Sequence, residues 1–182
     1  MKVLITGAAG RLGPRLASEL EGGHDLVLCD VRPLDDPRFR HLDILDAEAV
    51  RAVMQECDAV VHMAILDWPD CTPTEALRYT VPALQVHAVG IHNVLHAAWE
   101  AGARRFVYVS AVSAVDGIQP DTRIGPDTRH YSNGVYGMTK GFGEDLCRLF
   151  HHACGLPVAV LRLGNVYVPE AGGYWVGNVY VP

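Results

Sequence analysis

Short apolar runs alternate with helical patterns along most of this chain. Runs bounded by turn residues predict strands near 2–6, 26–30, 58–63, 105–110 and 157–162. Apolar residues at helical spacing predict helices near 11–21, 46–56, 82–101 and 134–154. In the first of these helices, Leu12, Leu16 and Leu20 share one face, and Gly22-Gly23 marks the C-terminal end. A strand followed by a helix, repeated in this way, is typical of parallel βαβ units.

Two of the predicted strands contain unbroken apolar stretches, Ala59-Val60-Val61 and Phe106-Val107-Tyr108-Val109, as expected of buried parallel strands. We therefore expect an α/β protein with a Rossmann-type, doubly wound parallel sheet in the strand order 3-2-1-4-5, with right-handed connections. In such a sheet a ligand binds at the carboxyl ends of the strands, here around the switch between strands 1 and 4. The stretch 111–133 is rich in Gly, Pro, Asp and Ser and predicts a long loop of the kind that often carries function.

Three glycines follow the first strand directly and precede the first helix. Gly7 allows a tight turn, and Gly10 lets backbone N–H groups approach a pyrophosphate. Gly13 lets the helix pack closely on the strand, with its positive dipole end toward the phosphates. A three-glycine pattern alone is weak evidence, but its place at a strand-to-helix junction is the context that dinucleotide binding requires.

An acidic residue at the end of the second strand supports the same interpretation. Asp30 lies 23 residues after Gly7, where a carboxylate accepts hydrogen bonds from the adenosine ribose hydroxyls of NAD. The same charge repels the 2′-phosphate of NADP. Arg32 could attract that phosphate, although a solvated surface charge is the interpretation we favour for it. The sequence therefore predicts NAD as the cofactor.

Tyr136 and Lys140 form a second chemical signal. Residues i and i+4 share a helix face, so the phenol and the ammonium point the same way. An unperturbed tyrosine titrates near pH 10. A neighbouring ammonium and an oxidised nicotinamide ring would lower that pKa, so that a phenolate could take the proton of a substrate hydroxyl while hydride leaves for NAD. Such a pair also occurs as a plain surface contact. Its place after a dinucleotide loop and a fourth parallel strand favours the catalytic interpretation.

Composition limits the partners that we expect. The 182 residues fit one domain with a sizeable core, and the formal net charge is −6, which argues against nucleic acid or an anionic membrane as a partner. No apolar run approaches the roughly 18 residues that span a membrane, and residues 3–5 predict a strand rather than a secretion signal. The five cysteines are scattered without metal-type spacing, so we expect reduced thiols in a cytoplasmic protein.

The histidines do not predict a metal site. His92 and His96 stand at i, i+4 spacing, but no third ligand is evident, and we interpret them as a solvated helix face. His62 ends the third predicted strand beside the expected cofactor path. We interpret it as a strand-end histidine whose hydrogen bonds are satisfied.

These motifs together resemble the extended short-chain dehydrogenase/reductases, the NAD-dependent epimerase/dehydratase family. The resemblance covers residues 3 to about 169 and rests on Thr6 to Gly13, Asp30, His41-Leu42-Asp43-Ile44, Asp58 to Ala64, Asn93, Tyr136 with Lys140, and Leu161 to Asn165. Within the family, the stretches 123–127 and 134–144 are most similar to the uronate dehydrogenases, which oxidise the anomeric carbon of a hexuronate to a lactone with NAD.

The resemblance implies a role for each matching residue. Tyr136 would be the base, and Lys140 would hold the nicotinamide ribose and tune Tyr136. The pyrophosphate would be held by Gly7, Gly10, Arg11, Leu12 and Gly13. Asp30 would contact the adenosine ribose, and Asp43 and Ile44 the adenine. Met63 and Ala64 would line the cofactor path, and Leu163, Gly164 and Asn165 would lie near the nicotinamide. The resemblance further implies a small sugar or sugar-acid substrate and a homodimer formed through the helices at 82–101 and 134–154.

The chain departs from the family at one catalytic position. The family places a Ser or Thr just past strand four, to hydrogen-bond the reacting oxygen, but that place falls on Ala111 or Val112 here. Ser110 and Ser113 flank it and are the candidate replacements. As local turn or strand-end hydroxyls they would have no catalytic role.

A second departure concerns the C-terminal part, which in the family builds much of the substrate pocket and is largely missing here. We expect an NAD-binding domain over 1–169 and an irregular tail over 170–182. The six residues at 164–169 recur at 177–182, and we interpret this repeat as a local duplication of doubtful origin rather than a functional element. Two other functions stay open: a nucleotide-sugar epimerase or dehydratase, and an NAD-binding protein without turnover.

Overall fold

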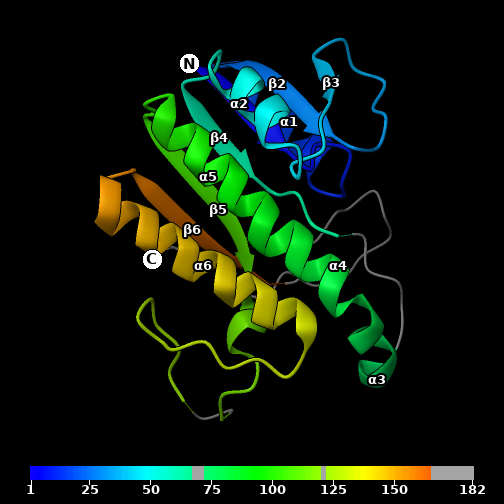
Figure 1. Cartoon of the computed structure of the whole chain (residues 1–182), viewed down its shortest axis with the longest axis vertical. Coiled ribbons are helices and arrows are strands. Elements are labelled where there is room, and N and C mark those ends of the chain that lie inside the picture. Colours follow the sequence, from blue (N-terminus) through cyan, green and yellow to red (C-terminus); the bar gives the residue numbers. More distant parts are fainter. Residues whose placement is uncertain (67–71, 120–121, 165–182) are drawn as a thin grey trace.

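A parallel sheet of six strands forms the centre of the computed structural model, which describes residues 1–66, 72–119 and 122–164 (Figure 1). The strands are β1 Lys2–Thr6, β2 Asp25–Asp30, β3 Phe39–His41, β4 Ala59–His62, β5 Arg105–Ala111 and β6 Val158–Leu163. They lie in the order β3-β2-β1-β4-β5-β6, and every neighbouring pair is parallel. The expected doubly wound α/β fold is therefore confirmed.

The order 3-2-1-4-5 holds when the strands are numbered as the structure has them, and it continues with β6. The edge position beside β2, however, is taken by β3. The strand predicted near 58–63, which was expected at that edge, is β4 and pairs with β1. The sequence pattern missed β3 because its three residues, Phe39-Arg40-His41, carry no apolar run. This strand forms because its backbone extends the edge of β2, with Leu28 opposite Phe39 and Asp30 opposite His41.

The helices follow the predicted alternation. They are α1 Gly13–Leu20, α2 Ala47–Met54, α3 Pro73–Ala76, α4 Thr80–Leu84, α5 Ile91–Glu100 and α6 Val135–Cys154. Two 3₁₀ turns, Leu77–Tyr79 and Val112–Val115, and one π-helical turn, Gln85–Gly90, join them. The helix predicted over 82–101 is thus α4, the π-helical turn and α5 in succession. In the part of the chain that the structure describes, we find no helix with the length and apolar character needed to cross a bilayer.

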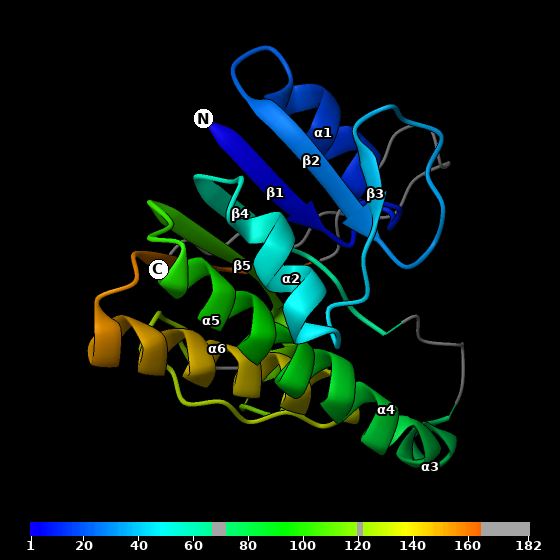
Figure 2. The ribbon, with the colours of Figure 1, turned by 45° about the horizontal axis from the view of Figure 1, so that its top comes forward.

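Helices lie on both faces of the sheet. Figure 2 shows α1 behind β1 and β2, and α2, α5 and α6 in front. Alternate residues of β1, β2 and β4 supply the two cores. In β1, Leu4 packs with α2, α5 and α6, whereas Val3 and Ile5 pack with α1. After β1 the chain turns to the α1 face, and after β4 it continues to the opposite face. The chain therefore leaves the carboxyl ends of β1 and β4 in opposite directions, which is the arrangement that the predicted ligand site requires.

Candidate active site

The glycine loop is pressed between β1, the end of β4 and α1. Gly7 has a φ of +75°, and a Cβ placed there would lie 2.6 Å from the backbone nitrogen of Ala64. A Cβ on Gly13 would overlap the carbonyl oxygen of Ala8. The tight turn and the close packing expected of these glycines are both present, since a side chain at either position would force the loop apart.

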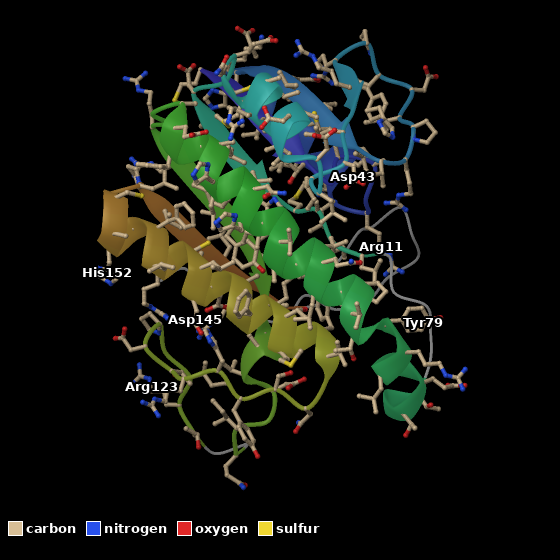
Figure 3. All side chains as sticks on the ribbon, viewed as in Figure 1. Arg11, Asp43, Tyr79, Arg123, Asp145 and His152 are labelled. Atoms are coloured by element: carbon tan, nitrogen blue, oxygen red, sulfur yellow. The ribbon has the colours of Figure 1, made fainter. Side chains whose placement is uncertain are left out.

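The loop fits an anionic group such as a pyrophosphate. The first turn of α1 has no side-chain cap, because Leu12 occupies the N-cap position and Pro14 follows within the turn. The positive end of the helix dipole favours a negative charge there. Arg11 is exposed at the same place, and Figure 3 shows its side chain at the carboxyl-end edge of the sheet.

Asp30 is built into the glycine loop. Its carboxylate is buried and accepts hydrogen bonds from the backbone nitrogens of Ala9 (3.0 Å) and Arg32 (2.9 Å). The Arg32 side chain folds back over the loop, with Nη2 donating to the Ala9 carbonyl (3.2 Å) and Nε 3.7 Å from an Asp30 oxygen. The Arg32 side chain is 52% exposed, as expected of a surface charge, but its guanidinium is also paired within the candidate ribose site.

The predicted adenine and cofactor-path residues lie near the same edge. Asp43 is exposed, and its carboxylate accepts from the Leu45 nitrogen at 2.9 Å (Figure 3). The Ile44 side chain is buried against the π-helical turn, and Asn93 donates to the Ile44 carbonyl at 3.0 Å. Met63 continues from β4, with its nitrogen donating to Thr6 O at 3.0 Å. The segments after β3 and after β4 are thus both fixed to the frame by hydrogen bonds.

Lys140 is buried on the inner face of α6. Its Nζ donates to the Val109 carbonyl at 2.8 Å and lies 5.0 Å from the centre of the Tyr108 ring and 5.8 Å from that of Tyr136. Burial lowers the pKa of Lys140 to about 7. The side chain therefore reaches the carboxyl end of β5, where a cofactor ribose would lie in this fold.

Tyr136 departs from the sequence-based expectation. Burial raises the pKa of its phenol, whereas the pattern predicted a lowered pKa. The physical reason is geometric. The Lys140 ammonium is directed to a backbone carbonyl and not to the phenol, so desolvation of the Tyr136 ring dominates.

The structure separates the two candidate serines. Ser110 is buried and donates to a Glu144 carboxylate oxygen at 2.5 Å. Glu144 lies eight residues after Tyr136 on α6, about 12 Å along the helix axis, so the Ser110 hydroxyl is directed away from the phenol. Ser113 lies in the 3₁₀ turn after β5, and its carbonyl oxygen occupies the place that a Cβ on Gly137 would take. Of the two candidates, Ser113 is therefore the one whose backbone lies beside the start of α6, where the Ser132 hydroxyl also lies.

The sequence did not predict the buried ionic cluster whose Glu144 accepts the hydrogen bond of the Ser110 hydroxyl. Arg162 donates to both Glu144 oxygens, with Nε at 3.0 Å and Nη2 at 2.7 Å, and His130 Nε2 donates to Glu144 at 2.9 Å. Arg162 Nη1 also donates to the Gly125 carbonyl at 3.2 Å, which fixes the loop that precedes α6. Burial opposes ionisation of Glu144, but these hydrogen bonds outweigh it and lower the pKa of Glu144 to about 2. The available signal was the spacing of Glu144 four residues after Lys140 on the same helix face.

His62 is confirmed as a satisfied strand-end histidine. Its Nδ1 is hydrogen-bonded to Thr6 Oγ1 at 2.8 Å, and its ring stacks on Tyr108 with the centroids 5.9 Å apart. Burial, together with the charge of Lys140, lowers the pKa of His62 to about 3, so the ring is neutral. At the other candidate position near the nicotinamide, Leu163 ends β6 opposite Ala111. Asn165 lies outside the described residues.

Comparison with known proteins agrees with this geometry. Residues 3–178 match the model of the NAD-dependent epimerase/dehydratase family. The chain is 33% identical to the uronate dehydrogenase of Agrobacterium fabrum, over 95% of this chain and 64% of that enzyme. It is 27% identical to the NAD-dependent glucose-6-phosphate dehydrogenase of Haloferax volcanii, over 90% of this chain and 68% of that enzyme.

A solved structure shows the same likeness. The crystal structure of a mutant uronate dehydrogenase from Agrobacterium tumefaciens, complexed with NAD, matches with a TM-score of 0.74 and 31% identity, over 86% of this chain and 58% of that one. This chain spans 60–64% of the length of the curated uronate dehydrogenases that it matches. The glycine loop, the carboxylate after β2, the Tyr136–Lys140 pair and the match across nearly the whole sequence place the chain in the NAD-dependent epimerase/dehydratase family.

Proposed function

We propose that this protein is an NAD-dependent dehydrogenase that oxidises a hydroxyl group of a sugar or sugar acid, as uronate dehydrogenases do. The observation that carries the proposal is the position of Tyr136 and Lys140. They share one face of α6, and Lys140 is bonded to the carboxyl end of β5 beside the divergence of β1 and β4. The similarity to uronate dehydrogenases supports this class of substrate.

The glycine loop and the segments after β2, β3 and β4 supply the proposed cofactor site. Gly7, Gly10, Gly13 and the uncapped start of α1 would hold the pyrophosphate, and Asp30 the adenosine ribose. Asp43 with Ile44, Met63 with Ala64, and Leu163 with Asn165 complete the proposed set. NAD, when bound, accepts the hydride that leaves the substrate carbon.

The proposed chemistry needs a base that takes the proton of the substrate hydroxyl. Tyr136 would be that base, and the reaction requires its pKa to fall from the raised value that burial imposes. The positive charges able to lower it are the Lys140 ammonium and the oxidised nicotinamide ring. Lys140 would also hold the nicotinamide ribose. Ser113, whose backbone carbonyl lies beside Gly137, would use its hydroxyl to hydrogen-bond the reacting oxygen in place of the missing serine at Ala111 or Val112.

The cations near the site favour a small acid over a nucleotide sugar. Between residues 141 and 164 the described cations of the Lys/Arg type are Arg148 and Arg162. Arg162 is committed to Glu144, and Arg148 donates to Asp145 at 2.6 Å. A nucleotide diphosphate would need unpaired cations of this kind. A monoanionic sugar acid and net oxidation are therefore the proposed reaction, with nucleotide-sugar epimerisation or dehydration as the second candidate.

NADH formation tests the proposal directly. The purified protein is mixed with NAD and, in turn, with uronates, aldoses and nucleotide sugars, and NADH absorbance is followed. We expect turnover with a uronate, and a loss of about 10²–10⁴-fold in kcat for Tyr136→Phe with nearly unchanged NAD affinity. Tyr131→Phe is the matched control, because Tyr131 is exposed. Absence of turnover with every sugar, together with intact NAD binding, would favour the non-catalytic NAD-binding protein, which the lack of a hydroxyl at Ala111 and Val112 also suggests.

The proposed assembly is a homodimer through α4, α5 and α6. α4 and α5 follow one another along one line, and α6 lies beside them (Figures 1 and 2). Apolar side chains are exposed on this surface, among them Val81 (66% exposed) on α4, Val89 in the π-helical turn, and Met138 and Phe142 on α6. An apolar surface of this kind is typical of an interface between copies.

We also propose residues 1–169 as the NAD-binding domain. The tail at 170–182 lies outside the described residues.

A further inference from the structure

His87 connects two parts of the proposed site that are far apart in the sequence. It lies in the π-helical turn between α4 and α5 and is only 3% exposed. Its Nε2 accepts a hydrogen bond from the backbone nitrogen of Leu66 at 2.9 Å. Its Nδ1 is 2.7 Å from Thr139 Oγ1, on α6. One buried ring therefore joins the segment after β4 to the helix of Tyr136 and Lys140.

The partners of His87 fix its tautomer. The Leu66 N–H can only donate, so Nε2 has no proton and Nδ1 carries one when the ring is neutral. The Nδ1–H group then donates to Thr139 Oγ1, and the Thr139 hydroxyl donates onward to the Tyr136 carbonyl oxygen at 2.9 Å. The ring stays neutral because burial, and next the charge of Lys140, lower the pKa of His87 to about 3. Both ring nitrogens are thus hydrogen-bonded, and the donors run in one direction along the chain of bonds, from the Leu66 N–H through His87 and Thr139 to the Tyr136 carbonyl oxygen.

The same ring also touches the proposed base. The His87 and Tyr136 ring centres are 6.1 Å apart, with an angle of 77° between the ring planes, an edge-to-face contact. The π-helical turn that carries His87 is a rare local widening, and such turns occur frequently at functional sites. An apolar residue could fill the space but could bond neither Leu66 nor Thr139.

We propose that His87 is a positioning residue, which holds the segment at 63–66 in register with the helix that presents Tyr136. The inference rests on the proposed function, because that segment contains the proposed cofactor contacts Met63 and Ala64. His87 itself touches no reacting atom. It acts through Leu66 on the cofactor side and through Thr139 on the side of the base, so its two hydrogen bonds have separable consequences.

Two substitutions at Thr139 test the link to the base. Thr139→Val removes the acceptor of the Nδ1–H group at nearly constant volume, and Thr139→Ser keeps it. We expect Thr139→Val to lower kcat about 10-fold to 10²-fold, the scale of a misplacement near 1 Å, with little change in KM for NAD. Thr139→Ser should restore kcat to within about 2-fold to 3-fold of the wild type. A wild-type kcat in Thr139→Val would overturn the proposal.

His87→Ala tests both links together. It should lower kcat at least as much as Thr139→Val and, unlike that variant, weaken NAD binding about 10-fold, measured by calorimetry. His92→Ala is the matched control, since His92 is an exposed histidine on α5. If His87→Ala fails to fold, the Thr139 pair still decides. Unchanged NAD affinity and kcat in folded His87→Ala would overturn the proposal.

A measurement without turnover separates this inference from the proposed function. Nitrogen-15 NMR of the histidine rings should show His87 neutral and protonated on Nδ1, and His87→Ala identifies its signal, or Thr139→Val where that variant alone folds. A ring protonated on Nε2 would overturn the proposal even if the protein oxidises sugars. If the wild type turns over no sugar, the tautomer and the NAD titrations of His87→Ala and Thr139→Val still decide it.

Discussion

The ammonium of Lys140 and the carbonyl oxygen of Val109 are joined by a hydrogen bond of 2.8 Å. This bond crosses from α6 to β5 in the protein interior and is the contact that holds the Lys140 side chain at the carboxyl end of the sheet. Burial of this cation lowers its pKa to about 7, so the Lys140 ammonium titrates near neutral pH. A buried ammonium at a proposed active site lowers the free energy of unfolding, and a substitution at Lys140 makes this cost measurable.

Lys140→Met should make the protein more stable but inactive. The folded-state pKa of about 7 lies below the ordinary lysine pKa of 10.5, so between these pH values the unfolded chain binds one proton more than the folded chain. The contribution of Lys140 to stability therefore rises as pH increases from 7 to 10.5 and is unfavourable below that window. We expect Lys140→Met to raise the free energy of unfolding near pH 6 by several kcal/mol, less the contribution of the lost hydrogen bond to the Val109 carbonyl. The gain should shrink toward pH 10 in urea denaturation.

Lys2→Met is the control for this prediction, because the Lys2 side chain is about one third exposed and pairs with Glu56 at the surface. It should show no such pH dependence. A gain for Lys140→Met that is the same at both ends of the pH range would contradict the assignment of the effect to a buried cation.

Gly13→Ala should disrupt the glycine loop. Its Cβ would overlap the carbonyl oxygen of Ala8, a backbone atom that cannot rotate away. We expect a loss of about 1–3 kcal/mol in the free energy of unfolding and at least 10-fold weaker NAD binding. Gly22→Ala is the matched control, since nothing lies within 4 Å of a Cβ there, and it should be neutral or slightly stabilising. Unfolding curves and calorimetric titration of both variants check this, and equal behaviour of the two would refute it.

The buried cluster around Glu144 predicts acid sensitivity. Although burial opposes ionisation, hydrogen bonds from His130, Arg162 and Ser110 lower the folded-state pKa of Glu144 from 4.5 to about 2. The stability that this carboxylate contributes is therefore present above about pH 4.5 and is lost as pH falls from there toward 2. Glu144→Gln should cost about 3–5 kcal/mol at neutral pH, because it leaves the buried Arg162 without its counterion.

Chemical denaturation of Glu144→Gln and of wild type between about pH 7 and pH 3 gives the check. The difference between the two proteins should narrow as pH falls. Glu48→Gln serves as the control, since the Glu48 side chain is 82% exposed and its ion pair should contribute little. A difference that does not change with pH would mean that the Glu144 charge is not what stabilises the fold.

Periodic patterns predicted those parts of the structure that local chemistry determines. The strand at 2–6 follows from an apolar run, the glycine loop from its turn residues, and α6 from a helical period, and the structure has all three near the predicted bounds. β3 was missed because Arg40 and His41 form a strand only through the edge of β2. The separation of Ser110 from Ser113 and the direction of Lys140 depend on contacts across α6, β5 and β6, which no spacing in the sequence encodes. The raised pKa of Tyr136 follows from the same tertiary burial.

Asp30 and Arg32 allow a final prediction about the choice of cofactor. The Asp30 carboxylate accepts the Ala9 and Arg32 backbone N–H groups and lies 3.7 Å from the Arg32 guanidinium. It therefore fixes the loop, offers acceptors to ribose hydroxyls and neutralises the cation that could otherwise attract a 2′-phosphate. We expect wild type to bind NAD more tightly than NADP.

Asp30→Ala should reverse this preference, because it removes the ribose acceptor and releases the Arg32 guanidinium from its ion pair. NAD binding should weaken about 10-fold while NADP binding holds or improves, and calorimetric titration with both cofactors measures the ratio. The double variant Asp30→Ala with Arg32→Ala is the control, since it should bind both cofactors weakly. If wild type binds NADP as tightly as NAD, Arg32 governs the site. If Asp30→Ala leaves both affinities unchanged, the carboxylate serves the loop alone and the adenosine ribose lies elsewhere.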